Sequence, residues 1–154
     1  MTGDAPLLRR PPRALGAAGL LPQVACVVVG LLAPAWGGHA VIAGGVYAAV
    51  ILSFLGGMWW MQALCRGEPR WWPYGLAVVP SLIAWAALLP WLAGSAAGRW
   101  PLVALAAALL VSPAGDRSIG SFAGDVPAWR RLRHLLSGGL GAMTLLLATL
   151  PAAA

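Results

Sequence analysis

The residues that could carry out acid–base, nucleophilic or metal chemistry are few in this chain of 154 residues. It has two histidines, His39 and His134, two cysteines and four acidic residues. Their spacing gives no Cys/His cluster of the kind that binds metals, and none of the motifs HExxH, GxSxG or a phosphate-binding loop. The two histidines flank different apolar segments and are expected at opposite membrane surfaces. We therefore predict no catalytic residue, no metal site and no cofactor, and we expect the protein not to be an enzyme.

One adjacent pair, Asp116 and Arg117, could supply an acid and a base beside lipid headgroups. Exposed pairs of this kind contribute little to stability and are common in solvated loops and at helix ends. A solvated ion pair is the simpler interpretation. A lipid-modifying enzyme that uses Asp116 is the third hypothesis for the function.

The composition explains why reactive residues are so scarce. Hydrophobic residues make up 60% of the chain and charged residues 9%, against about 25% charged residues in a typical soluble domain. A transmembrane helix needs about 20 largely apolar residues. Five segments meet or approach that length, so we predict an all-α, polytopic membrane protein with a compact bundle of five transmembrane helices. The predicted helices cover residues 14–33, 39–65, 72–93, 99–112 and 132–150, after a basic tail at 1–13.

Two details of this division follow from local signals. Pro22 predicts a kink or a ragged start in the first helix, because proline removes a backbone donor. Short Gly-rich turns at 34–38 and 94–98 are expected to separate the first helix from the second and the third from the fourth. Residues 112–131 are expected to form the one long loop.

The arginines predict how the bundle is oriented. With five crossings, nine of them fall on one side and only Arg99 falls on the other. The positive-inside rule places the arginine-rich side in the cytoplasm. The N-terminus is then cytoplasmic and the C-terminus periplasmic, in the inner (plasma) membrane. The nine are Arg9, Arg10, Arg13, Arg66, Arg70, Arg117, Arg130, Arg131 and Arg133.

The high pI of about 11.1 has the same explanation. The basic residues flank apolar segments and do not line one polar face, which indicates contact with anionic lipid headgroups. Nucleic acid is not an expected partner. Near the last helix, Trp129, Arg130, Arg131 and Arg133 are the predicted headgroup contacts.

A stripe of small residues marks the second helix. Gly45, Ala49, Ser53 and Gly57 repeat every fourth residue, so they share one helical face, and Gly56 widens it. Small residues let neighbouring helices approach closely in a membrane. The face could pack within the chain, or it could bind a membrane-protein partner or a second copy.

The interiors of the predicted helices carry no Asp, Glu, Lys or Arg near their centres. Transporters that move protons or ions keep ionisable groups at that depth, so a proton-driven transporter is disfavoured. A small transporter or channel for a weakly polar solute remains the second hypothesis. Its pathway would be lined by Ser53, Gly56, Gly57, Gln62 and the tryptophan pair Trp59 and Trp60.

Four stretches of sequence, in order, resemble the family of small membrane proteins that includes transmembrane protein 69. They are AGLLP at 18–22, YAAVILSFLGG at 47–57, VVPSLIAW at 78–85 and PAWRRLRHLL at 127–136. The resemblance implies a multi-span helical membrane protein whose domain has no known function, and it supplies no catalytic residue. Relatives often have a histidine shortly after the two glycines, where this chain has Trp59.

The first hypothesis is therefore an integral membrane protein that is not an enzyme. It would act through helix packing or partner contacts, in an assembly or scaffold role. The uncharged helix interiors and the small-residue face favour this interpretation over the other two.

Overall fold

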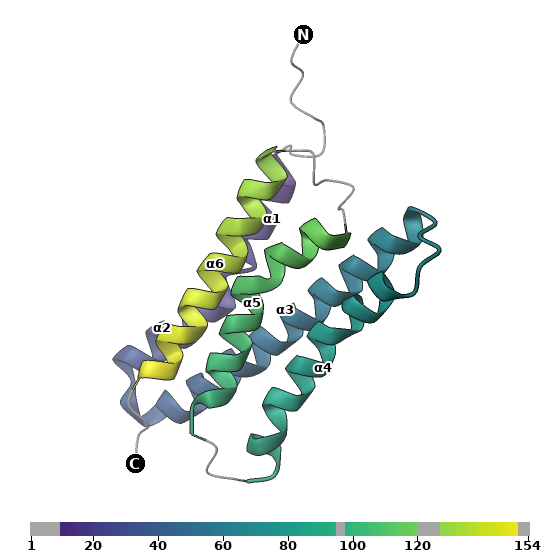
Figure 1. Ribbon diagram of the computed structural model, residues 1–154. Coiled ribbons are helices and arrows are strands. Elements are labelled where there is room, and N and C mark those ends of the chain that lie inside the picture. The colour runs from purple at the N-terminus through teal and green to yellow at the C-terminus, as the bar shows by residue number, and fades with distance from the viewer. Residues whose placement is uncertain (1–9, 95–97, 120–126, 151–154) are drawn as a thin grey trace.

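The computed structural model describes residues 10–94, 98–119 and 127–150, and in these ranges the chain is helical with no strand. The predicted all-α class is confirmed, and Figure 1 shows the helices side by side in a bundle. A 3-10 turn at Pro34–Trp36 joins the second and third helices. The α-helices are α1 (Arg10–Ala18), α2 (Leu21–Leu32), α3 (Gly37–Cys65), α4 (Trp72–Leu92), α5 (Trp100–Ile119) and α6 (Pro127–Thr149).

The first predicted helix is divided into α1 and α2, as Pro22 indicates. The break falls at Gly19 and Leu20, and α2 then begins at Leu21 with Pro22 as its second residue. The hydroxyl group of Tyr47, on α3, donates a hydrogen bond to the carbonyl oxygen of Gly19. The interruption is therefore fixed by a neighbouring helix and supplied with a polar partner, as backbone at membrane depth requires.

Helices α5 and α6 are longer than the sequence predicts, so the expected loop at 112–131 is wrong at both ends, and its middle, 120–126, lies outside the described residues. Helix α5 continues through Pro113 to Ile119, and α6 begins at Pro127 instead of residue 132. Proline at 113 removes the backbone donor for the carbonyl oxygen of Leu109. The hydroxyl group of Ser112 donates to that oxygen at 2.7 Å, which replaces the missing bond and lets the helix continue.

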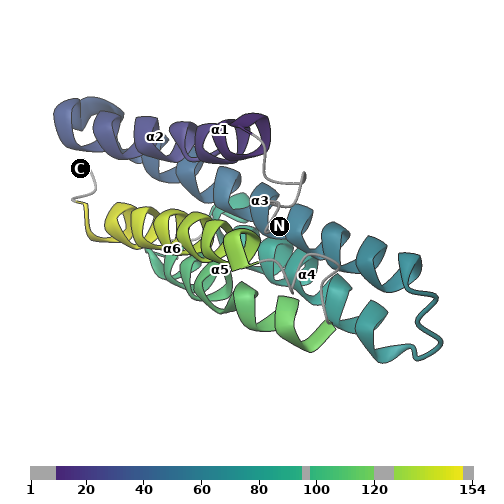
Figure 2. The same ribbon diagram turned by 90° about the horizontal axis from the view of Figure 1, so that it is seen from above.

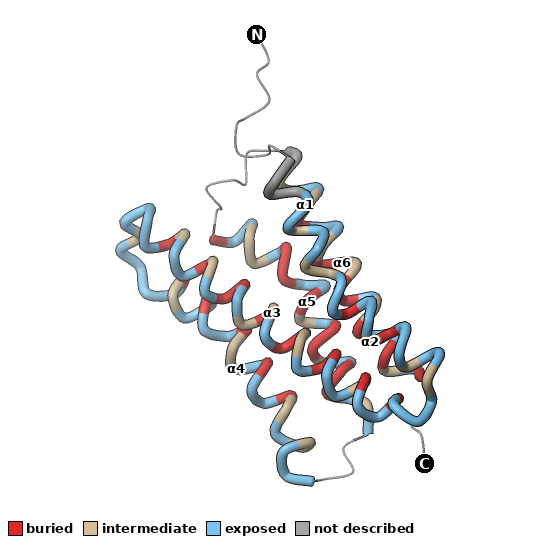
Figure 3. The backbone as a smooth tube through the Cα atoms, turned by 180° about the vertical axis from the view of Figure 1, so that it is seen from behind, coloured by how far each residue is buried: buried red, intermediate tan, exposed pale blue. Residues whose placement is uncertain are grey.

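Helix α3 is the centre of the bundle and packs against α2, α4, α5 and α6. Figure 2 shows α1 and α2 on one side of α3 and α4 on the other. Helices α5 and α6 pack against each other. Figure 3 shows buried residues on the faces turned toward neighbouring helices and exposed residues on the outward faces. The largest apolar core cluster includes Ala48, Leu52, Leu55, Ala84, Leu105, Leu109 and Leu140.

Four of the described helical stretches are long and apolar enough to cross a membrane. They are Ala14–Leu32, Pro34–Cys65, Trp72–Leu92 and Trp100–Ile119. Helix α6, with 23 residues, is about 34 Å long at 1.5 Å per residue. Its first turns carry three arginines, and it lies beside α5 along the bundle (Figure 1).

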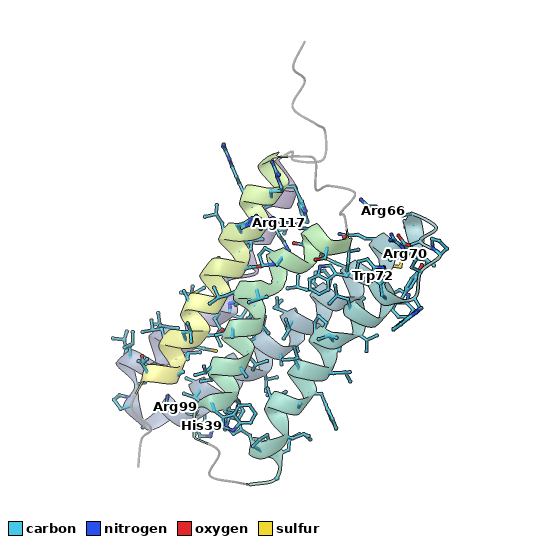
Figure 4. The ribbon with its side chains drawn as sticks, viewed as in Figure 1. His39, Arg66, Arg70, Trp72, Arg99 and Arg117 are labelled. Carbon is cyan, nitrogen blue, oxygen red and sulfur yellow. The ribbon has the colours of Figure 1, made fainter. Side chains whose placement is uncertain are left out.

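The charged ends of the bundle are well separated. Arg66, Arg70 and Arg117 lie at one end, and Arg99 and His39 lie at the other (Figure 4). Arg99 donates a hydrogen bond of 2.7 Å to the carbonyl oxygen of Leu147, in the last turn of α6. Arginine is favoured there because the final carbonyls of a helix lack partners and carry partial negative charge. The arginine-rich end and the end of α6 thus lie at opposite poles.

Candidate functional site

A buried ion pair lies near the arginine-rich end, between α5 and α6. The guanidinium Nε of Arg133 is 2.9 Å from Oδ2 of Asp116. Arg133 lies near the beginning of α6, about 9 Å along the axis from its first residue. Arg133 is nevertheless only 6% exposed. The expected solvated pair of Asp116 with its neighbour Arg117 is therefore wrong. A buried charge is costly unless it is paired, and here the partner comes from another helix.

Trp59 brings α3 into the same cluster. Its indole Nε1 donates a hydrogen bond of 2.6 Å to Oδ1 of Asp116. Gly115 makes room for the ring, because a Cβ at that position would collide with the six-membered part of the indole. Both oxygens of Asp116 are thus occupied, one by the indole and one by the guanidinium of Arg133.

Two serines complete the polar cluster on Arg133. Its two terminal nitrogens donate to the hydroxyl oxygens of Ser137 and, at 3.2 Å, Ser112. The two hydroxyl oxygens are 3.3 Å apart. Ser112 uses its one hydrogen on Leu109, so Ser137 is the donor between the serines. We name Trp59, Ser112, Asp116, Arg133 and Ser137 the polar clamp, because together they connect α3, α5 and α6.

An open basic patch lies on the outer side of the same end. It is formed by Arg117, Arg130, Arg131, His134 and Leu135. Nδ1 of His134 lies 2.6 Å from the carbonyl oxygen of Arg130, and Nε2 lies 3.4 Å from a guanidinium nitrogen of Arg117. A carbonyl only accepts and an arginine only donates, so this arrangement has the proton of His134 on Nδ1.

An apolar cavity of about 340 Å³ lies on the opposite side of α6 from this patch. Its polar lining comes from the clamp residues Arg133 and Ser137. The remaining walls are supplied by α1, α3, α5, α6 and the break between α1 and α2. They include Leu15, Gly16, Ile51, Phe54, Met58 and Trp129.

A second buried polar contact lies further from the arginine-rich end. Nε2 of Gln23, on α2, donates to the hydroxyl oxygen of Thr144 at 3.0 Å, and Thr144 donates to the carbonyl oxygen of Leu140 at 2.7 Å. Both side chains are fully buried. The contact connects α2 to α6 in a region that is otherwise apolar.

The small-residue face of α3 is covered at one end and open at the other. Gly45 and Ala49 are buried, and a Cβ at Gly45 would meet the ring of Trp91 and Leu102. Ser53 is half-buried, and Gly57 is exposed with open space around it. Gly56 turns instead toward α4, where a Cβ would collide with the carbonyl oxygen of Ala77.

The residues proposed to line a pathway are not brought together. Trp59 is buried in the polar clamp, whereas Gly57 faces outward and Gln62 is half-buried. The apolar cavity is lined by none of the residues suggested for the pathway. Among the described residues, no group of three or more His, Cys, Asp or Glu side chains could hold a metal ion.

The predicted headgroup residues have different surroundings. Arg130 and Arg131 are exposed, and Trp129 is half-buried at the cavity. Arg133 is buried in the polar clamp, which corrects the expected headgroup contact. The spacing of polar residues in the sequence indicates this burial. Arg133, Ser137 and Thr144 share one helical face, and polar residues in transmembrane helices usually face the bundle interior.

The comparisons with known proteins agree with this architecture. A family model described as "Protein of unknown function (DUF3429)" matches residues 8–150. The chain is also 37% identical to Transmembrane protein 69 of Xenopus tropicalis over 89 residues, which are 56% of this chain and 34% of that protein. The chain thus covers about a third of the length of this relative. No solved structure matches the chain.

Proposed function

We propose that this chain, which belongs to the DUF3429 family of proteins of unknown function, acts by binding within the membrane. The family match confirms the resemblance to transmembrane protein 69. The chain crosses the inner (plasma) membrane five times, with α6 as the fifth crossing. The arginine-rich end is cytoplasmic. The protein is a scaffold or assembly factor for another membrane protein and performs no catalysis.

The fifth crossing is supported by the two ends of α6. Its first turns carry Arg130 and Arg131, beside Arg117 in the basic patch. Its last turn is held by Arg99, at the far pole of the bundle. A helix of about 34 Å is long enough for the hydrocarbon core of about 30 Å. The arginine distribution supports the orientation through the positive-inside rule.

The binding role is carried by the uncovered part of α3. Gly57 has open space where a side chain would lie, and Ser53 is half-buried one turn earlier. The exposed residues Val50 and Met61 flank this notch on the same helical face. Two small residues four apart let another helix approach closely. The occupant we propose is a transmembrane helix of a different membrane protein.

The polar clamp supports a structural role for the half-buried carboxylate of Asp116. Oδ1 of Asp116 accepts the hydrogen bond from Trp59, and Oδ2 forms the ion pair with Arg133, so the carboxylate holds α3, α5 and α6 together. The lipid-modifying hypothesis required Asp116 at the headgroups, and the transporter hypothesis required residues that here face different directions. Neither has a specific observation in its favour.

The test is photo-crosslinking in native membranes. A photoreactive amino acid at Val50 or Met61 should form one discrete adduct with a different protein. Gly57→Leu should abolish the adduct by filling the notch. Gly38→Leu is the matched control, because Gly38 also has open space around it but lies at the other end of α3. Adducts only with a second copy, only with lipid, or equally strong in Gly57→Leu would contradict the proposed partner.

A further inference from the structure

The basic patch gathers cationic side chains from two helices around one hollow. Arg117 comes from α5, and Arg130, Arg131 and His134 come from the first turns of α6. The hollow has a volume of about 580 Å³, within the range of about 300–1,000 Å³ that is usual for small-molecule sites. All three arginines are exposed, so their guanidinium groups are accessible to a ligand.

The acidic residues that the structure describes do not neutralise this patch. Glu68 pairs with Arg70 after α3, and Asp116 pairs with Arg133 in the polar clamp, although its neighbour in sequence is Arg117. The other two acids of the chain lie outside the described residues. Like charges that are brought together repel each other, so an anion bound between the arginines stabilises the arrangement.

His134 connects the two helices of the patch. Its Nδ1 donates to the carbonyl oxygen of Arg130 at 2.6 Å, and its Nε2 accepts from a guanidinium nitrogen of Arg117 at 3.4 Å. An arginine has five N–H donors, so this contact leaves Arg117 with most of its hydrogen-bonding capacity. The imidazole thus keeps a guanidinium from α5 beside the two from α6.

The positive-inside rule by itself does not require this geometry. The rule depends on the number of Lys and Arg residues near the ends of the crossings, and widely separated arginines satisfy it equally well. Guanidinium groups that converge from two helices are instead suited to phosphate, which each of them matches by bidentate hydrogen bonding. Three such groups match more than one negative charge, which favours a ligand with two phosphates.

The apolar residue of the patch indicates that the phosphates belong to a lipid. Leu135 is 71% exposed and lies about 6 Å along the axis from Arg131, toward the middle of α6. Guanidinium groups at the end of a crossing, with a leucine nearer its middle, match a phospholipid with its phosphate at the surface and its acyl chain inside. Basic pockets between transmembrane helices on the cytoplasmic side bind headgroups of this kind.

We propose that the basic patch binds one phospholipid whose headgroup carries two phosphates. The phosphates contact Arg117, Arg130 and Arg131. One acyl chain of the lipid lies along Leu135. The site rests on the proposed fifth crossing, which places the first turns of α6 at headgroup depth, but it does not depend on the proposed protein partner.

Native mass spectrometry of the purified full-length protein tests the site. The probes are cardiolipin, which has two phosphates, and phosphatidylglycerol, which has one. The wild type should retain one cardiolipin about tenfold more tightly than phosphatidylglycerol. Arg117→Gln should lower the retention of cardiolipin about fivefold, because one arginine near an anionic headgroup contributes a share of the affinity of that size.

The matched control is Arg70→Gln. Arg70 and Arg117 lie at the same end of the bundle (Figure 4), but Arg70 is not part of the patch. Both variants remove one positive charge from an exposed position, so neither disturbs the core. Arg70→Gln should retain cardiolipin as the wild type does. Equal losses in the two variants would show a general attraction of anionic lipid and would overturn the site.

Soluble anions separate a lipid from other sources of negative charge. Pyrophosphate and hexaglutamate, each added in tenfold excess over cardiolipin, should leave the bound lipid in place, because neither has an acyl chain to lie along Leu135. Displacement by pyrophosphate would assign the patch to a free phosphate ligand. Displacement by hexaglutamate would assign it to an acidic protein segment. Either result would overturn the proposed lipid.

The lipid site and the proposed partner site fail separately. Gly57→Leu should lose the protein adduct and keep cardiolipin, whereas Arg117→Gln/Arg131→Gln should lose cardiolipin and keep the adduct. The fifth crossing has its own test in the labelling of Ala154→Cys. Equal retention of cardiolipin and phosphatidylglycerol by a wild type that shows this crossing would overturn the lipid site alone.

Discussion

Asp116 and Arg133 form an ion pair of 2.9 Å between two different helices, inside a bundle that is otherwise almost uncharged. Removing one partner of a buried pair leaves the other charge without compensation, which costs about 3–5 kcal/mol. We expect Asp116→Leu and Arg133→Met each to lower the free energy of unfolding by that amount. The double variant should lose much less than the sum, because it leaves no buried charge. Steric-trapping measurements of unfolding in bicelles or detergent would give the three values of this double-mutant cycle. Additive losses would show that the two groups are not coupled.

The same assay tests how α5 passes through a proline. Ser112 donates to the carbonyl oxygen of Leu109, which Pro113 leaves without its helical donor. Ser112→Ala should cost about 1 kcal/mol, the scale of hydrogen bonds between polar groups in membranes. In a Pro113→Ala background the backbone donor is restored, so part of this cost should disappear. An unchanged cost would mean that Ser112 acts only through Arg133.

The adjacent glycines of α3 give a matched pair. A Cβ at Gly56 would collide with the carbonyl oxygen of Ala77 on α4, whereas Gly57 has open space. Gly56→Ala should therefore separate α3 from α4 and destabilise the protein by about 1–3 kcal/mol. Gly57→Ala should be neutral or slightly stabilising, because alanine favours the helix. The reverse order of stabilities would contradict the packing of α3 on α4.

The turn between α3 and α4 predicts a pH dependence. The hydrogen bond from Arg70 lowers the pKa of the Glu68 carboxyl below its ordinary value. The stabilisation from this contact is present at neutral pH, and it is lost as the pH falls through the lowered pKa of the folded protein. Arg70→Gln should raise the pKa of Glu68 toward the ordinary value. Side-chain carbon shifts of Glu68, followed by NMR against pH, would reveal this; identical midpoints in both proteins would contradict it.

Much of the fold could be predicted from sequence because apolar runs end at strong local signals. The predicted helices at 39–65 and 72–93 differ little from α3 and α4, since prolines, glycines and charged residues mark their ends. The helical break before Pro22 has the same kind of local cause.

The ends of α5 and α6 could not be found in this way. Considered with its neighbours in sequence, Asp116 looks like a loop residue and Arg133 looks like an exposed headgroup contact. In the structure they pair with each other across two helices, and local composition does not report such a contact. The apolar cavity depends on side chains from several helices, so no single segment predicts it.

The most direct test of the central claim, five crossings with the arginine-rich end in the cytoplasm, is labelling with a membrane-impermeant maleimide. Cys65 is exposed at the arginine-rich end of the bundle, and His39 is exposed at the other end. Three single-cysteine proteins are compared in a Cys26→Ala background. One keeps Cys65, and the other two carry His39→Cys or Ala154→Cys in its absence. When the maleimide is added from the periplasmic side, His39→Cys and Ala154→Cys should react, whereas Cys65 should not. Labelling of Cys65 from that side would contradict the orientation, and labelling of Ala154→Cys only from the cytoplasmic side would contradict the fifth crossing.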